Sequence, residues 1–353
     1  MGLFSRSSSK TLLLLDISSG SVGGAYVSVT PKKAPNIIYS TRVVVEDRLA
    51  GQELGILRAL GSLIHTLVSK GPEIKAATGE GSASEALLAI GSPWHISTVR
   101  VEHMEKEKPF TITERLLAET LKEEDAAVIQ SESILSAVLN GYQVQDPIGK
   151  NVRKADLTIL SSRINRELAT HISNGIRKVV PLVRSIETPV LIHETVRRAF
   201  PHQEDCVVLN VSEEQTDILL MKRGVLVSIN TTAFGTHAFE RIAKKHGHSS
   251  FDMKGTAIDT TPHESEIAEA QSAWVSGMVT ELKKTVTEHA LPRTVYLITT
   301  RESVDFIKGV MDTADIRALW LSDEPATLVP ILPERINDPL LDFLVTKVTK
   351  EVI

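Results

Sequence analysis

An apolar run that ends in an acidic residue and a turn of small residues is the feature that most constrains the fold of this chain. The leucines at 12–15 lead into Asp16, and a Ser/Gly turn at 18–21 precedes a second apolar stretch that ends at Tyr26. The pattern predicts a β-hairpin. Backbone N–H groups and hydroxyls of such a turn can surround a phosphate, and a carboxylate at the strand end can hold Mg²⁺ through water. An ordinary hairpin with a Gly/Ser turn explains these residues equally well.

The composition indicates more than one domain and argues against nucleic acid as a partner. At about 100–200 residues per domain, the 353 residues predict two or three domains or subdomains. A net charge of −5 and only 4% aromatic residues give little attraction to nucleic acid or anionic lipid. The single cysteine, Cys206, allows no intramolecular disulfide and fits a reducing compartment. No window approaches about 18 uninterrupted apolar residues, so we expect a cytoplasmic protein without a transmembrane segment.

The order of strand, polar turn and strand occurs twice in the chain. In the first half we expect strands at 36–45 and 86–90 and a helix that ends before Gly71-Pro72. In the second half we expect strands at 207–211, 216–221, 225–229 and 294–298, and helices at 189–199, 233–246 and 262–289. Strands that alternate with helices are typical of α/β layers. The sequence therefore predicts a duplicated α/β fold.

A segment with a different pattern of expected strands and helices separates the two copies. It has strand-like stretches at 127–142 and 154–160, joined through an Asp-Pro-x-Gly turn at 146–149, and it ends in a helix at 164–180. The mixed charges at 102–108 predict an exposed loop. We interpret the whole segment as a small α+β insert.

With this layout the chain resembles the actin-like ATPase superfamily, and within it the pilus-assembly PilM and cell-division FtsA families. Residues 16–22 (Asp-Ile-Ser-Ser-Gly-Ser-Val) are similar to the family's first phosphate motif. Residues 141–150, followed by the strand at 155–160, are similar to the Tyr-x-Val…Asp-Pro-x-Gly segment of its insert. The resemblance implies an α/β, duplicated actin-like (ribonuclease H-like) two-lobe fold with a small α+β insert subdomain of the SHS2 type.

The resemblance also implies a division of the chain. We expect a flexible N-terminal tail at 1–10, the first lobe at 11–91, the insert at 92–181, the second lobe at 182–336 and a C-terminal helix at 337–353. Leu341, Leu344, Val345 and Val348 give this helix an apolar face, which suits a membrane surface or the protein's own core. Because no long linker precedes it, we expect the helix to return to the first lobe.

The second hairpin departs from the family's Asp-Ile-Gly-Gly-Gly-Thr-Thr-Asp motif. Thr216 and Asp217 match, Asn210 replaces the leading Asp, and residues 212–214 (Ser-Glu-Glu) replace the three glycines. At about 4 Å and an effective dielectric of about 20, each glutamate would oppose a phosphate charge by about 4 kcal/mol. The late strand meets Thr299-Thr300 where the family has a Gly pair. The resemblance thus implies a degenerate nucleotide site.

The resemblance assigns no catalytic residue and a vestigial or weak set of nucleotide-binding positions. These are Asp16, Ser18, Ser19, Gly20, Ser21, Asn210, Gln215, Thr216 and Asp217. Asp16 would hold Mg²⁺ only if ATP binds, and ATP binding is in doubt because of the departures above. His246 and His248 could serve as metal ligands, but a solvated helix end explains them better.

The implied function is a cytoplasmic scaffold of a membrane-associated assembly. The partners would be inner-membrane pilus or divisome proteins, recognised through a short peptide, and would hold the protein at the inner face of the membrane. Self-association into filaments is a further alternative, and it goes with an active ATPase. The alternatives are an active Mg-ATP-dependent ATPase and, less favoured, a small-molecule kinase on the same fold.

Overall fold

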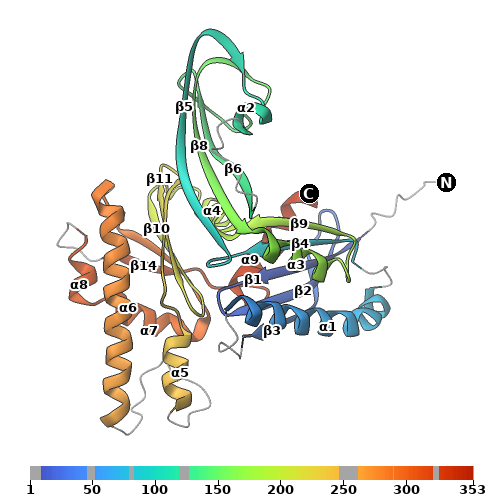
Figure 1. Cartoon of the computed structure of the whole chain (residues 1–353), viewed down its shortest axis with the longest axis vertical. Helices are drawn as coiled ribbons and strands as arrows, with labels where there is room; N and C mark the ends of the chain where they lie inside the picture. The colour runs from blue at the N-terminus through green and yellow to red at the C-terminus, as the bar shows by residue number, and fades with distance from the viewer. Residues whose placement is uncertain are drawn as a thin grey trace.

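The residues that the structure describes form three β-sheets, two of which form neighbouring lobes while the third projects from them (Figure 1). This computed structural model describes residues 9–45, 52–78, 83–118, 127–245, 261–288, 290–320 and 326–352. Residues 1–8 of the expected tail lie outside these ranges, as do His246 and His248. The first strand begins at Lys10.

The first sheet contains five strands in the order β3-β2-β1-β4-β9. They are β1 (Lys10–Ile17), β2 (Ser21–Val29), β3 (Asn36–Val44), β4 (Glu85–Ile90) and β9 (Leu182–Glu187). The central strand β1 pairs antiparallel with β2 and parallel with β4. Because both faces of β1 are covered, its residues are apolar almost without interruption. Leu13 and Leu15 face the helices α1 (Gln52–Thr78) and α3 (Arg166–Ile176). Leu12 and Leu14 belong to the apolar core between the two lobes.

The second sheet repeats this topology in the order β12-β11-β10-β13-β14. Its strands are β10 (Cys206–Val211), β11 (Thr216–Lys222), β12 (Val225–Thr232), β13 (Thr294–Ile298) and β14 (Thr327–Pro330). The outer face is covered by α5 (His237–Lys245), α6 (Thr261–Glu288) and α7 (Val304–Met311), and the segment also contains a 3₁₀ turn (Arg301–Ser303) and α8 (Ala314–Arg317). The duplicated α/β architecture expected from the sequence is therefore present.

Two helices fill the space between the lobes. α4 (Thr188–Ala199) and α9 (Pro339–Val352) share one apolar core with the inner faces of both sheets. α9 packs against α4 and against β1 and β2 of the first sheet. Its first turn is capped by Asp338, whose Oδ1 accepts a hydrogen bond from the Leu341 N–H at 3.1 Å. The apolar face of α9 is thus buried in the protein's own core.

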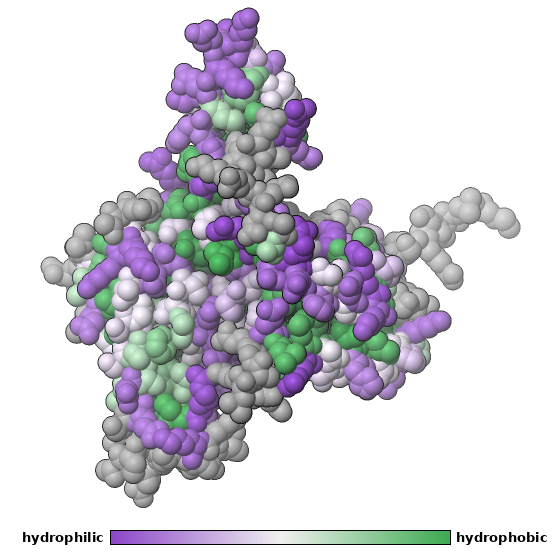
Figure 2. All heavy atoms as spheres, viewed as in Figure 1, coloured by the Kyte–Doolittle hydropathy of each residue, from purple (hydrophilic) through white to green (hydrophobic). Residues whose placement is uncertain are grey.

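The third sheet is the insert, with the order β5-β8-β6-β7. Its elements are β5 (His95–Thr111), α2 (Glu114–Ala118), β6 (Val128–Leu139), β7 (Tyr142–Val144) and β8 (Asn151–Asn165). On the face shown in Figure 2, hydrophilic side chains dominate the far end of the insert, and hydrophobic ones gather toward its base. The base packs against β12 of the second lobe.

Three local expectations were wrong. The charged residues 102–108 belong to β5 rather than to a loop, because residues 102–105 pair with β8 while the charges stay at an exposed edge, and the register shifts between Glu105 and Phe110. α1 continues through Pro72 to Thr78, and the burial of Ile74, which is 4% exposed, holds this last part against the core. Residues 182–187, assigned to the second lobe, form β9 of the first sheet because they pair in parallel with β4.

The interlobe core generates a stability prediction. Leu344 on α9 is fully buried, whereas Leu54 on α1 is 44% exposed. We expect Leu344→Ala to lower the free energy of unfolding by about 2–5 kcal/mol, because it removes packed atoms and leaves a cavity. Leu54→Ala, the matched control, should change it by less than about 1 kcal/mol. Urea unfolding followed by circular dichroism measures both, and equal effects would contradict a packed α9.

Candidate functional site

The turns of the two hairpins face each other across the boundary between the lobes. Each follows the central strand of its sheet, and both close through the same backbone hydrogen bond at 3.0 Å: Ser18 N–H to the Ser21 carbonyl, and Ser212 N–H to the Gln215 carbonyl. Ligands of α/β proteins bind outside the carboxyl ends of such strands. This boundary is therefore the candidate site.

The two turns are in direct contact. The Ser19 and Ser212 hydroxyl oxygens lie 2.8 Å apart, and the Glu214 N–H donates to Ser19 Oγ at 2.9 Å. The Ser21 hydroxyl donates to the Glu213 carboxylate. A Cβ added at Gly20 would lie only 2.8 Å from Cβ of Glu213, so glycine permits this approach. At these contacts there is no space for a phosphate between the turns.

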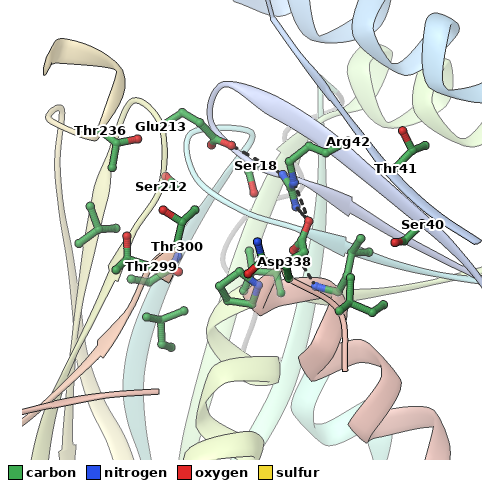
Figure 3. A pocket seen from close by; sticks show the side chains of 18 residues that line it. Ser18, Ser40, Thr41, Arg42, Ser212, Glu213, Thr236, Thr299, Thr300 and Asp338 are labelled. Atoms are coloured by element: carbon green, nitrogen blue, oxygen red, sulfur yellow. Dashed lines mark hydrogen bonds and ion pairs between the residues drawn. The ribbon is translucent and has the colours of Figure 1, made fainter. Parts of the chain in front are cut away.

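An arginine from β3 neutralises the acidic residue at the end of β1. Arg42 Nη2 lies 2.5 Å from Oδ2 of the fully buried Asp16, and Arg42 Nε donates to Asp338 Oδ2 at 2.6 Å. Arg42 Nη1 donates to Ser21 Oγ at 2.5 Å and lies 3.7 Å from Glu213 Oε1. Figure 3 shows the guanidinium between Glu213 and Asp338. The carboxylate expected to hold Mg²⁺ is therefore paired with a cation of the chain itself.

Burial and charge shift the pKa of both central groups. Burial raises the pKa of Asp16 to about 6, against the opposing effect of Arg42, and the neighbouring Asp338 adds to the rise. Burial tends to lower the pKa of Arg42, but Asp338, Asp16 and Glu213 outweigh it and hold that pKa well above its ordinary value. Arg42 is thus a permanent cation, whereas Asp16 titrates close to neutral pH.

The second glutamate of the second turn also has a cationic environment. Glu214 Oε1 lies 2.8 Å from Nδ1 of His237, and Arg241 Nη1 donates to both of its carboxylate oxygens at 3.1–3.2 Å. Both partners lie on α5 of the second lobe. Each of the two glutamate charges that the sequence placed against a phosphate therefore lies beside an arginine of the chain.

The remaining predicted positions of the second hairpin make hydrogen bonds within the second lobe. Asn210 Nδ2 donates to Asp217 Oδ2 at 3.2 Å, and Thr231 Oγ1 donates to Asp217 Oδ1 at 2.9 Å. Thr216 Oγ1 donates to the Phe234 carbonyl at 2.8 Å. Gln215 Oε1 is buried and accepts no hydrogen bond from the described residues. The structure thus places Asn210 near the cleft but directs Thr216 and Asp217 to other partners.

A cavity of about 250 Å³ lies beside these contacts, between the lobes (Figure 3). Thr299 and Thr300, which replace the family's Gly pair, line it, together with Asn210, Ser212, Glu213 and Asp338. The cavity is thus slightly smaller than typical sites for drug-sized ligands, which measure about 300–1,000 Å³. The Oγ1 of Thr299 is buried there without a hydrogen-bond partner among the described residues.

The residues present do not fit Mg-ATP in this arrangement. Asp16 is already paired with Arg42, and Glu213 accepts the Ser21 hydroxyl that a phosphate would need. In the described part of the chain, no three or more His, Cys, Asp or Glu residues are grouped as metal ligands. Sequence reasoning missed Arg42 and Asp338 because 296 positions separate them and neither belongs to a motif. Glu213 and Glu214 were noticed, but only as obstacles to a ligand.

Comparisons with known proteins identify the fold. No family model and no curated protein matches this chain. A structure of the PilM-PilN type IV pilus biogenesis complex matches with a TM-score of 0.63 and 12% identity, over 97% of this chain and 98% of that one. A Bacteroides thetaiotaomicron protein with an actin-like ATPase fold and unknown function matches with a TM-score of 0.51 and 11% identity, over 98% and 99%. The protein therefore has the actin-like ATPase fold, and the predicted likeness to PilM is confirmed. The likeness to FtsA stays a prediction.

The buried carboxyl of Asp16 predicts an unusual pH dependence. Because its pKa rises from 3.8 to about 6 on folding, the folded state binds the proton more tightly, and this contribution to stability is lost as pH rises through 6. When the pH is lowered from 7.5 to 4.5, the free energy of unfolding of the wild type should therefore rise by about 2 kcal/mol relative to that of Asp16→Asn. Urea unfolding of both proteins at the two pH values measures this, and parallel pH profiles would contradict it.

Proposed function

We propose that the protein is a scaffold of a membrane-associated assembly and that its cleft does not bind nucleotide. The observation that carries the proposal is the direct contact between the two turns at Ser19–Ser212 and Ser21–Glu213. In the actin-like ATPase fold, these turns occupy the place at which the resemblance puts the phosphates. The fold is thus retained as a framework, while side chains of the protein fill the site.

Binding of ATP would require several unfavourable changes at the turns at once. The contacts of Ser19 and Ser21 would have to break, and the carboxylates of Glu213 and Glu214 would lie beside the phosphates. Either glutamate, if it lost its arginine and met a phosphate, would oppose binding by about 4 kcal/mol, which is on the order of a thousandfold in affinity. Arg42 would also have to leave Asp16 before a metal ion could approach that carboxylate.

Calorimetry tests the loss of nucleotide binding. We expect no binding heat when Mg-ATP is added to the wild-type protein up to millimolar concentration, since the turns are closed and acidic. A triple variant, Ser212→Gly with Glu213→Gly and Glu214→Gly, removes the side chains that replace the family's glycines and is the variant best placed to regain affinity. Magnesium-dependent binding by wild type that Asp16→Ala abolishes would instead support the active ATPase.

A partner would connect this scaffold to the membrane. Among the described residues no helix is long and apolar enough to cross a bilayer. The similar solved structure is a PilM-PilN complex of type IV pilus biogenesis. By analogy, we propose an inner-membrane pilus protein as the partner of this chain. A divisome protein is the alternative, because the sequence also resembles the FtsA family.

A groove at the base of the insert suits a short peptide of such a partner. A cavity of about 250 Å³ lies between the insert strands β6 and β8 and the first-sheet elements β4, β9 and α3. Its lining combines apolar side chains, such as Ile129 and Ile164, with hydroxyls and Glu187. β9 is last in the strand order of the first sheet, and in the described part of the chain no strand pairs with its outer side, so an extended peptide could add there.

Cross-linking in cells tests the partner and the groove together. The wild-type protein should recover an inner-membrane pilus protein, and Ile129→Asp should reduce that recovery about tenfold, because Ile129 lines the groove and is 38% exposed. Tyr142→Asp, a control on the β7 hairpin where Tyr142 is 77% exposed, should leave recovery unchanged. Recovery of neither pilus nor divisome proteins would contradict the scaffold function.

A further inference from the structure

We infer that Arg42, Asp16, Asp338 and Glu213, hereafter the Arg42 clamp, hold the two lobes closed without any ligand. The clamp supplies from the chain itself the cation and the anion that a metal nucleotide would bring. This inference deepens the proposed function and rests on it in one respect, namely that the cleft holds no nucleotide.

The clamp joins parts of the chain that are far apart in sequence. Arg42 lies on β3 and Asp16 at the end of β1, both in the first sheet. Asp338 precedes α9 and caps its first turn through the Leu341 N–H. Glu213 lies in the turn between β10 and β11 of the second lobe. One guanidinium therefore connects the first sheet, the start of the interlobe helix and the second lobe.

The charges explain why the clamp needs no ion. The buried Asp16 carboxylate requires a cation, and Arg42 provides one whose charge does not depend on pH in the physiological range. A guanidinium has five N–H donors in a plane, which suits the simultaneous contacts to Asp16, Asp338 and Ser21. A metal ion at the same place would have to be recruited together with its nucleotide.

Glu213 supplies the anion of the clamp. Its Oε1 accepts from the Ser21 hydroxyl and lies 3.7 Å from Arg42 Nη1. Beside it, Ser19 contacts Ser212 and the Glu214 N–H, which adds neutral hydrogen bonds between the lobes. The closed state is therefore held by charge and by hydrogen bonds at the same boundary.

Hydrogen exchange of the full chain measures the clamp directly. The Glu214 amide is the reporter, because it donates to Ser19 Oγ across the boundary between the lobes. We expect Glu213→Gln, which keeps the side-chain shape but removes the charge, to speed exchange at residues 212–215 and 16–21 about tenfold. Arg42→Gln should do the same or more. Exchange in the insert strands β6 and β8 should not change.

A matched variant separates the clamp from ordinary ion pairs. Glu73→Gln removes the same charge from an exposed pair with Lys70 on α1, in which Glu73 is 69% exposed, and should leave both turns unchanged. If Glu213→Gln and Arg42→Gln, folded by circular dichroism, exchange like wild type at both turns, the clamp is wrong. If Mg-ATP slows exchange of the wild-type turns, the proposed loss of nucleotide binding is wrong instead. The two failures are thus distinguishable.

Discussion

The closed cleft depends on the burial of one carboxylate. Asp16 ends a strand whose apolar residues are covered on both sides, so its charge has no access to water. A buried charge is tolerated only with a partner, and removing the partner of a buried pair typically costs about 3–5 kcal/mol. Arg42 meets this requirement, and its remaining donors reach Asp338 and Ser21. The pairing of this one carboxylate thereby fixes the first turn and the start of α9.

Apolar packing and ion pairing affect the arrangement of the lobes in different ways. The core shared by both sheets, α4 and α9 determines that the lobes lie together, and it involves large aliphatic side chains such as Leu344. The polar contacts at the hairpin turns determine which surfaces of the lobes meet. Buried ion pairs contribute little net stability compared with apolar contacts of similar volume, but they are sensitive to geometry. The polar contacts of the cleft therefore specify how the lobes meet more than they add to stability.

The similarity to solved structures concerns the framework, and function has to be argued from the site. At 11–12% identity, the actin-like ATPase fold extends over nearly all of this chain, including its insert. The same framework can host different functions, according to the side chains at its site. Here the second turn carries Ser212, Glu213 and Glu214, which contact the first turn, and the proposed function rests on that contact.

The sequence by itself determined the duplicated α/β pattern, the insert and the contrast between an intact first turn and an altered second one. These features depend on local periodicity and turn chemistry, which short segments express. It did not reveal Arg42 or Asp338, nor the pairing of 182–187 with the first sheet, because each depends on contacts between distant positions. The sequence also showed Glu213 only as a charge that would repel a phosphate. The tertiary structure decided its role, because only folding brings Ser21 and Arg42 to that carboxylate and turns repulsion of a ligand into attraction between the lobes.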